Sequence, residues 1–185
     1  SSLSDAFQAV LPAFEARHPG SRVRLNLGAS GVLVRQLEQG APVDVLASAD
    51  EATAQRGVAL GLLEPASRRV FARNALVLVA PIGSALPQTL ADLARPELRR
   101  IALGKPASVP AGRYAREFLT AAGLWETLAP KYIMGTNVRQ VLDYVTRGEV
   151  DAGFVYATDA AIMLDKVRVA VTVPTAKPIL YPVAP

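Results

Sequence analysis

The feature that most constrains this chain is an unbroken apolar segment, Ala75-Leu76-Val77-Leu78-Val79-Ala80. A short apolar run of this kind, followed here by Pro81, is typical of a strand that is buried on both faces of its sheet. In an α/β protein, helices on the two faces of the sheet cover such a strand. The segment is therefore compatible with an α/β architecture.

The rest of the chain alternates short strands with helices, as this architecture requires. Apolar residues recur at helical spacing in residues 3–17 and 137–147, whereas residues 22–27 alternate polar and apolar side chains like a half-buried strand. Further strands are expected at residues 43–47, 100–103, 132–134, 152–156, 167–173 and 179–183, and further helices at 32–39, 50–60, 89–95 and 111–122. This order indicates a mostly parallel sheet covered by helices.

A break in the pattern after Pro81 divides the chain into two groups of strands and helices. We therefore expect two lobes with a ligand cleft between them. The first lobe would hold residues 1–81 and 174–185, and the second would hold residues 82–173. The two crossings, near 81–82 and 173–174, would form the hinge. Because open α/β sheets bind ligands at the carboxyl ends of their strands, the cleft is expected there.

Composition excludes several classes of protein. The 185 residues contain no cysteine, which excludes disulfide scaffolds, thiolate zinc sites and cysteine nucleophiles. The single histidine, His18, stands at the end of a predicted helix, where a cation is favoured. The 20 Lys and Arg residues outnumber the 16 Asp and Glu residues, but they are scattered and form no basic stripe. We therefore expect no nucleic-acid partner. No apolar run approaches the roughly 20 residues that a membrane-spanning helix needs.

Catalytic motifs are also missing. The sequence has no Gly-x-Gly-x-x-Gly and no Walker A lysine motif. The segment Gly28-Ala29-Ser30-Gly31 begins like a hydrolase nucleophile elbow, but position 32 is valine. Asp50 is expected as a helix N-cap. Asp151 and Asp159 flank a predicted strand, with no histidine to complete a metal site. The sequence therefore offers no motif for a nucleotide site, a serine hydrolase or a resident metal, and we expect no cofactor.

Four predicted helix starts share small residues and exposed backbone N–H groups. The first N–H groups of a helix lack partners and carry partial positive charge, so such ends bind anions. Taken singly, each start is also explained by ordinary helix capping. Four starts that converge on one cleft would be stronger evidence for an anion site. Tyr156 ends a predicted strand, either as a core aromatic or as a hydroxyl donor facing the cleft. The four starts are Ser1-Ser2-Leu3, Gly28-Ala29-Ser30-Gly31, Val109-Pro110-Ala111-Gly112 and Thr136-Asn137-Val138.

An ordered series of motifs resembles the periplasmic molybdate-binding proteins of molybdate ABC transporters, which have the type II periplasmic-binding fold. The series covers nearly the whole chain. It runs through Ser2-Leu3-Ser4-Asp5-Ala6-Phe7, Gly28 to Gln36, Gly40 to Asp50, Asn74 to Pro81, Val109 to Ala115, Asn137-Val138-Arg139, Gly153-Phe154-Val155-Tyr156 and Tyr181-Pro182-Val183-Ala184.

The resemblance implies a solute-binding protein that captures molybdate, and tungstate with it, for a membrane ABC permease. In that family neutral donors alone hold the oxyanion. Two serines come from the first lobe, and two backbone N–H groups and one tyrosine hydroxyl come from the second. The matching positions are Ser2, Ser30, Ala111, Val138 and Tyr156. The resemblance further implies a periplasmic location and no reaction, and we expect a monomer.

Alternative functions stay open at this point. The same fold could bind sulfate or another small oxyanion, could sense a ligand for a transcriptional regulator, or could act on a phosphorylated substrate. The sequence also departs from the family pattern, which has a strand before the position of Ser2 and helices after Tyr181-Pro182-Val183-Ala184. Ala29 and Gly31 stand where serines are common in the family, while Ser30 is retained.

Overall fold

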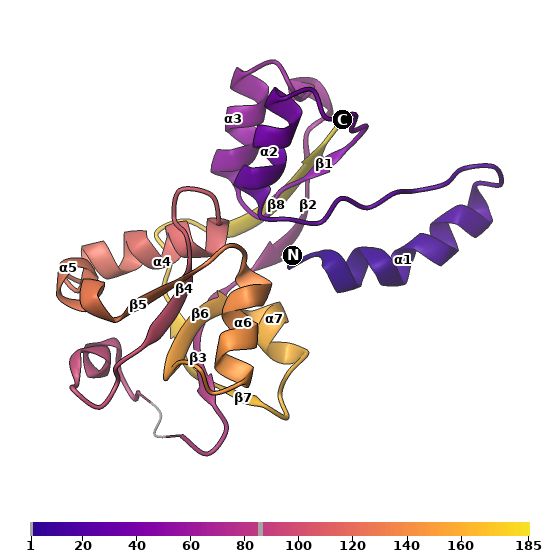
Figure 1. Cartoon of the computed structure of the whole chain (residues 1–185). Helices are drawn as coiled ribbons and strands as arrows, with labels where there is room; N and C mark the ends of the chain where they lie inside the picture. Colours follow the sequence, from indigo (N-terminus) through magenta and orange to yellow (C-terminus); the bar gives the residue numbers. More distant parts are fainter. Residues whose placement is uncertain (1, 85–86) are drawn as a thin grey trace.

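The computed structural model describes residues 2–84 and 87–185, so Ser1 of the first predicted helix start lies outside it. The described chain forms two sheets (Figure 1). In the smaller sheet, β8 (Ile179–Ala184) lies between β1 (Leu46–Ala47) and β2 (Arg69–Asn74) and is antiparallel to both. The helices α2 (Ser30–Glu38) and α3 (Glu51–Ala59) lie beside this sheet. A small core joins them through Val34, Leu46, Leu63 and Ala184.

The larger sheet has the strand order β5-β4-β6-β3-β7. Its strands are β3 (Leu76–Pro81), β4 (Ile101–Gly104), β5 (Tyr132–Gly135), β6 (Ala152–Tyr156) and β7 (Val167–Val173). Strands β5, β4 and β6 are mutually parallel, whereas β3 is antiparallel to both of its neighbours. The sheet is therefore mixed, and the parallel arrangement predicted from the sequence holds only for β4–β6.

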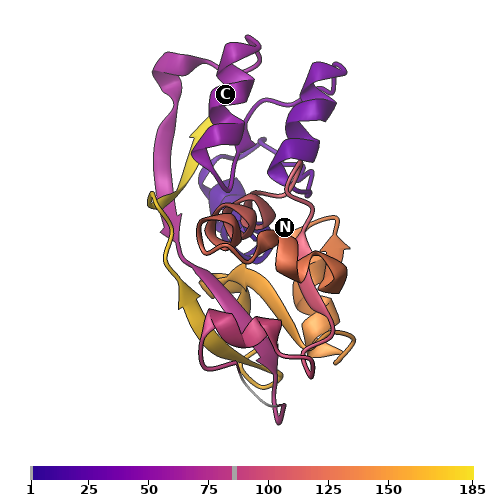
Figure 2. The ribbon, with the colours of Figure 1, turned by 90° about the vertical axis from the view of Figure 1, so that its left-hand side faces the viewer.

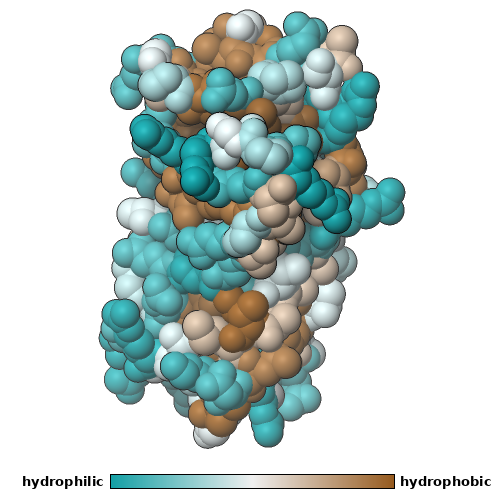
Figure 3. Space-filling model, turned by 90° about the vertical axis from the view of Figure 1, so that its right-hand side faces the viewer, coloured by the Kyte–Doolittle hydropathy of each residue, from teal (hydrophilic) through white to brown (hydrophobic). Residues whose placement is uncertain are grey.

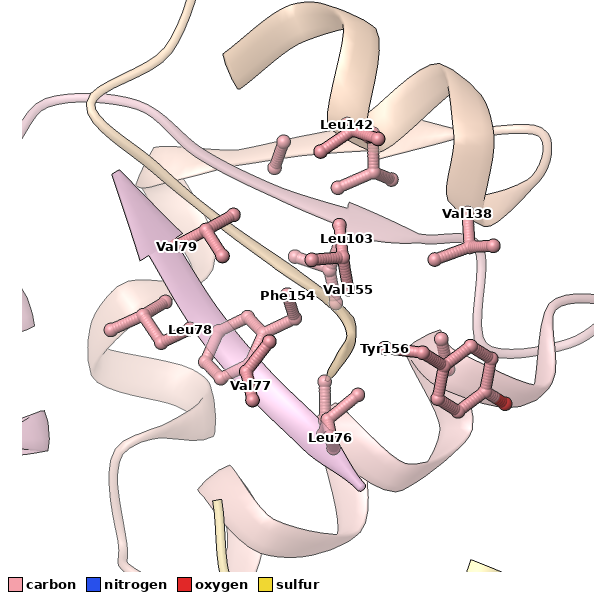
Figure 4. Close-up of a cluster of buried hydrophobic side chains, with 14 of the residues drawn as sticks. Leu76, Val77, Leu78, Val79, Leu103, Val138, Leu142, Phe154, Val155 and Tyr156 are labelled. Atoms are coloured by element: carbon pink, nitrogen blue, oxygen red, sulfur yellow. The ribbon is translucent and has the colours of Figure 1, made fainter. Parts of the chain in front are cut away.

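Helices cover both faces of the larger sheet. Helices α4 (Pro110–Ala121) and α5 (Trp125–Leu128) lie on one side, and α6 (Val138–Thr146) and α7 (Ala157–Ala161) lie on the other (Figure 1). Short 3-10 turns at Pro65–Ser67, Leu90–Ala94 and Ala129–Lys131 connect the remaining elements. This arrangement buries the strand predicted from the apolar run, since Leu76 to Ala80 are at most 3% exposed. Leu103, Leu142 and Phe154 pack against it (Figure 4).

The chain passes twice between the two sheets, which gives the elongated, two-lobed shape seen in Figure 2. The first passage is at Ala75, between β2 and β3, and the second comprises residues 174–178, between β7 and β8. Two-lobed α/β architecture is therefore confirmed. Residues 76–81, assigned to the first lobe in the sequence analysis, pair in the larger sheet, so the first passage lies earlier than the predicted 81–82. We call the halves around the smaller and larger sheets the small lobe and the large lobe.

Two segments of the small lobe make few internal contacts. Residues 21–27 are extended but pair with no strand in the described chain, so the strand predicted at 22–27 is not formed. Helix α1 (Ser4–Arg17) projects from the molecule with no buried residue, and Val10 and Phe14 are exposed. Figure 3, which views the side on which α1 projects, shows apolar residues exposed among polar ones. Across the described residues, every helix is too short or too polar to cross a membrane.

Candidate functional site

Three of the predicted site residues meet at one edge of the larger sheet. The parallel strands β4, β5 and β6 end at this edge, and each is followed there by a helix start. Ala111 lies in the first turn of α4, Val138 is the first residue of α6, and Tyr156 ends β6. The carboxyl ends of parallel strands are where open α/β sheets bind ligands. The topology therefore brings these three residues together, although 45 residues separate Ala111 from Tyr156 along the chain.

Both helix starts present backbone donors. Pro110 takes the first position of α4 and has no N–H, so Ala111 supplies the first donor of that helix. In α6 the Asn137 side chain caps the helix by accepting from the Gln140 N–H at 3.0 Å, which leaves the Val138 N–H without an intrahelical partner. These two N–H groups lie at the positive ends of their helix dipoles, where an anion is stabilised.

A close backbone approach fixes the start of α4 against β4. A Cβ atom on Gly112 would lie 1.8 Å from the Gly104 carbonyl oxygen, so any larger residue would force the helix away from the strand. Glycine at position 112 therefore keeps the Ala111 N–H at the sheet edge.

Ser30 brings a hydroxyl from the small lobe. It is the first residue of α2 and is 6% exposed. Its Oγ accepts a hydrogen bond from the Ala49 N–H at 3.0 Å. Because this bond uses an oxygen lone pair, the hydroxyl hydrogen stays available for donation to a ligand.

The Ser2 hydroxyl oxygen also accepts a hydrogen bond, in this case from Tyr181 in the last strand. The Tyr181 hydroxyl donates to Ser2 Oγ at 3.2 Å, and Asn74 Nδ2 donates to the Tyr181 hydroxyl at 2.9 Å. Burial raises the pKa of Tyr181 well above its usual value, so this hydroxyl remains a donor at neutral pH. The relay leaves the hydrogen of Ser2 free to point toward a ligand.

Tyr156 combines both roles considered for it in the sequence analysis. Its ring packs at the edge of the apolar cluster, and its hydroxyl oxygen points away from that cluster (Figure 4). The hydroxyl donates to the Ala49 carbonyl of the small lobe at 3.2 Å. Burial raises the pKa of Tyr156 well above its usual value, and neighbouring Tyr181 and Tyr114 add to the effect. Tyr156 is therefore a neutral hydrogen-bond donor, and its one hydroxyl hydrogen would have to turn from the Ala49 carbonyl to reach a ligand.

The five predicted residues line a single cavity of about 670 Å³. Ser2, Ser30, Ala111, Val138 and Tyr156 share this lining with Ala49, with the extended residues 22–27 and with apolar side chains such as Phe7 and Leu33. No carboxylate is among the five. Asp44, which also lines the cavity, is exposed. Among the described residues, His, Asp and Glu nowhere gather in a group of three that could hold a metal ion.

The sequence analysis assigned no role to three residues that support the site. Tyr181 and Asn74 orient Ser2, and Ala49 contacts both Ser30 and Tyr156 through its backbone. All three occur in or beside the motifs that carried the resemblance, but none is predicted to face the ligand. The polar Asn74 directly before the apolar run was the one local signal that could have drawn attention to this network.

The family model described as bacterial extracellular solute-binding protein matches residues 1–185. The chain belongs to this family. This solute-binding protein is 39% identical over 184 residues to a putative ABC transporter substrate-binding lipoprotein, YvgL, of Bacillus subtilis, covering 98% of the chain and 70% of YvgL. It is 34% identical to the molybdate-binding protein ModA of Haemophilus influenzae, covering 99% of the chain and 74% of ModA.

Its fold matches solved structures of the same kind. The periplasmic molybdate-binding protein of Azotobacter vinelandii aligns with a TM-score of 0.82 at 26% identity, covering 99% of this solute-binding protein and 81% of that structure. The type II periplasmic-binding fold expected from the resemblance is thereby confirmed.

Proposed function

We propose that this protein captures molybdate, and tungstate with it, and delivers the anion to a membrane ABC permease. The observation that carries the proposal is the convergence of Ser2, Ser30, Ala111, Val138 and Tyr156 on one cavity. These residues offer three hydroxyls and two helix-start N–H groups, and none of them carries a carboxylate. The molybdate-binding names of its relatives support the same substrate.

The chemistry of the donors suits a fully deprotonated oxyanion. Molybdate is a dianion at neutral pH, and its oxygens can only accept hydrogen bonds. A site whose five anion-facing residues are donors and include no carboxylate therefore favours it over an anion that still carries a proton. Sulfate has the same charge and tetrahedral shape but shorter bonds, so cavity size has to separate the two. Tungstate is nearly the size of molybdate and is expected to bind as well.

The two lobes would close around the anion. The crossings at Ala75 and at residues 174–178 would serve as the hinge. Closure removes water from the site, which strengthens each hydrogen bond to the anion. The closed form would also present a defined shape to the permease. We propose that the protein acts in the periplasm as a monomer, without catalysing a reaction and without binding nucleic acid.

The test is thermal unfolding with molybdate, tungstate, sulfate or phosphate added in turn. A ligand at 100 times its dissociation constant adds about 2.7 kcal/mol to the free energy of unfolding. We expect a clear rise in melting temperature with molybdate and tungstate alone. A rise with sulfate or phosphate instead would keep an oxyanion site but overturn the substrate. Absence of any rise in a folded sample would overturn the proposed function.

A further inference from the structure

Two arginines occupy unfavourable positions at the ends of the helices that face the cavity. Arg113 lies in the first turn of α4, two residues after Ala111, and Arg139 directly follows Val138 in α6. A cation near a helix N-terminus is repelled by the helix dipole. Some tertiary interaction has to offset this repulsion at both positions.

Each arginine pairs with a carboxylate of the opposite lobe. Arg113 Nη1 contacts Asp50 Oδ2, and the Arg139 guanidinium lies 2.5 Å from Asp5 Oδ2. Asp50 is the N-cap of α3, with its side chain only 2% exposed, and Asp5 lies in the first turn of α1. Both carboxylates lie close in sequence to residues of the site or its support, since Asp50 comes directly after Ala49, which contacts Ser30 and Tyr156, and Asp5 comes soon after Ser2. The two pairs thus join the lobes beside the cavity.

Arg139 is held in place by a second carboxylate. Asp159 Oδ1 lies 3.4 Å from the Arg139 guanidinium, and the Asp159 side chain is fully buried under α6. Neither Asp159 oxygen forms a hydrogen bond of normal geometry in the described chain. Asp159 lies in α7 and Arg139 lies in α6, so both belong to the large lobe. The arginine is therefore anchored on its own lobe and reaches across to Asp5.

Two further contacts show how closely the lobes meet at this cavity. The Gly31 N–H of α2 donates to the Ser108 carbonyl at 3.1 Å, and the Tyr156 hydroxyl donates to the Ala49 carbonyl at 3.2 Å. The ion pairs Asp50–Arg113 and Asp5–Arg139 therefore belong to a structure in which the two lobes are in direct contact beside the cavity.

We propose that Arg113 and Arg139 are positioning residues that latch the two lobes together and so set the affinity for the anion. The inference rests on the proposed oxyanion function. A cross-lobe ion pair exists only while the lobes are together, so it stabilises the closed form and not the open one. Any ligand that binds the closed form more tightly gains affinity when that form is more populated.

The competing explanation is that both arginines attract the anion directly by their charge. The two explanations predict opposite changes in anion affinity when the carboxylate partner of an arginine is neutralised. Under the latch, Asp5→Asn and Asp50→Asn remove a cross-lobe attraction and weaken anion binding. Under direct attraction, the same substitutions unmask a positive charge beside the anion and tighten binding. Asn at position 50 can still cap α3, because Asn is as good an N-cap as Asp.

The experiment measures equilibrium binding and dissociation rates of molybdate for the two single variants and the double variant. We expect affinity to fall about threefold for Asp5→Asn, whose carboxylate is exposed, and about tenfold for the more buried Asp50→Asn. The loss should lie mainly in a faster dissociation rate. For Asp5→Asn, the loss of affinity should be smaller in high salt, because a hollow of about 480 Å³ beside the Asp5–Arg139 pair opens to solvent and lets salt screen the charges.

Matched controls remove a charge without touching the cleft. Arg116→Gln alters the same helix as Arg113, but Arg116 lies over the Trp125 ring at 5.5 Å. Glu149→Gln breaks an exposed ion pair with Arg147 that lies within the large lobe. Both controls should keep the wild-type affinity.

Small-angle scattering without any ligand makes the latch testable even if the proposed function fails. The double variant Asp5→Asn/Asp50→Asn should have a larger radius of gyration than the wild type at low salt, whichever anion the protein takes. Unchanged compactness, or tighter binding in either single variant, would overturn the latch. Failure of the wild type to bind any oxyanion would overturn the proposed function alone.

Discussion

Tyr181 donates its hydroxyl hydrogen to Ser2 Oγ at 3.2 Å, and this contact joins the last strand to the residue that precedes the first helix. Asn74 Nδ2 donates in turn to the Tyr181 hydroxyl and to Thr158 Oγ1 at 2.8 Å. Asn74 and Thr158 come from opposite sides of the passage between the two sheets. The orientation of the Ser2 hydroxyl therefore depends on both lobes.

Tyr181→Phe should weaken molybdate binding about fivefold while leaving the fold intact. The phenylalanine ring still fills the buried space, but Ser2 loses the donor that orients its hydroxyl. A neutral hydrogen bond of this kind contributes about 1 kcal/mol. Isothermal titration of the variant measures the effect. Tyr114→Phe is the matched control, because Tyr114 lies outside the cavity lining. Equal affinity for Tyr181→Phe and wild type would remove the relay from the site.

Ser30→Ala should weaken anion binding by about 1.5–3 kcal/mol, the usual value of a hydrogen bond to a charged group. The free energy of unfolding without ligand should fall by only about 1 kcal/mol, since the Ala49 N–H loses its acceptor. Titration with molybdate and denaturant unfolding give the two values. Ser21→Ala, at an exposed serine, serves as the control. A loss of stability with unchanged affinity would make Ser30 a purely structural residue.

Asp159 gives the protein a pH-dependent stability. Burial raises its pKa from 3.8 to about 6 in the folded chain, against the opposing charge of Arg139. The folded state therefore holds this proton at a higher pH than the unfolded state, and the resulting stability is lost as the pH rises from about 4 to above 6. Asp5, Tyr156 and Tyr181 also interact electrostatically with Asp159.

Asp159→Asn should therefore make the ligand-free protein more stable at pH 7, by up to about 3 kcal/mol, with the gain vanishing near pH 4. Denaturant unfolding at a series of pH values measures both the gain and its slope. Asp165→Asn, at an exposed aspartate, should change stability by less than about 0.5 kcal/mol at any pH. A variant that loses stability at pH 7 would show that the charged form of Asp159 supports the fold.

The parts of the fold and site that follow from local pattern were predictable from the sequence. The apolar run at residues 75–80 is the buried strand β3, and Asp50 and Asn137 cap α3 and α6 as helix-start chemistry indicates. The five site residues came from the family resemblance, and topology then brought them to one cavity. Whether they bind the anion stays a prediction.

Features that depend on tertiary contact were not predictable. Residues 22–27 alternate like a strand, but a strand needs a neighbour, and the described chain supplies none beside them. The division at Pro81 followed the end of the apolar run, whereas the passage between sheets is fixed by which strands pair, and this places it at Ala75. Asp5 and Arg139 are 134 residues apart, so no local signal could link them.

Gly31→Ala should weaken molybdate binding without lowering the stability of the ligand-free protein. A Cβ atom on Gly31 would lie 2.8 Å from the Ser108 carbonyl oxygen and 3.0 Å from Ser108 Cα, so the lobes would have to move apart. Within α2 alone the change is favourable, because alanine stabilises a helix by up to about 1 kcal/mol relative to glycine. We therefore expect unchanged or higher stability without ligand, together with at least tenfold weaker molybdate binding through faster dissociation. Gly57→Ala is the reverse control, since its Cβ would meet only Leu63 inside the small lobe, at 2.7 Å, and should lower stability while sparing affinity. If Gly31→Ala binds molybdate as tightly as the wild type, close approach of α2 to Ser108 plays no part in closing the cleft.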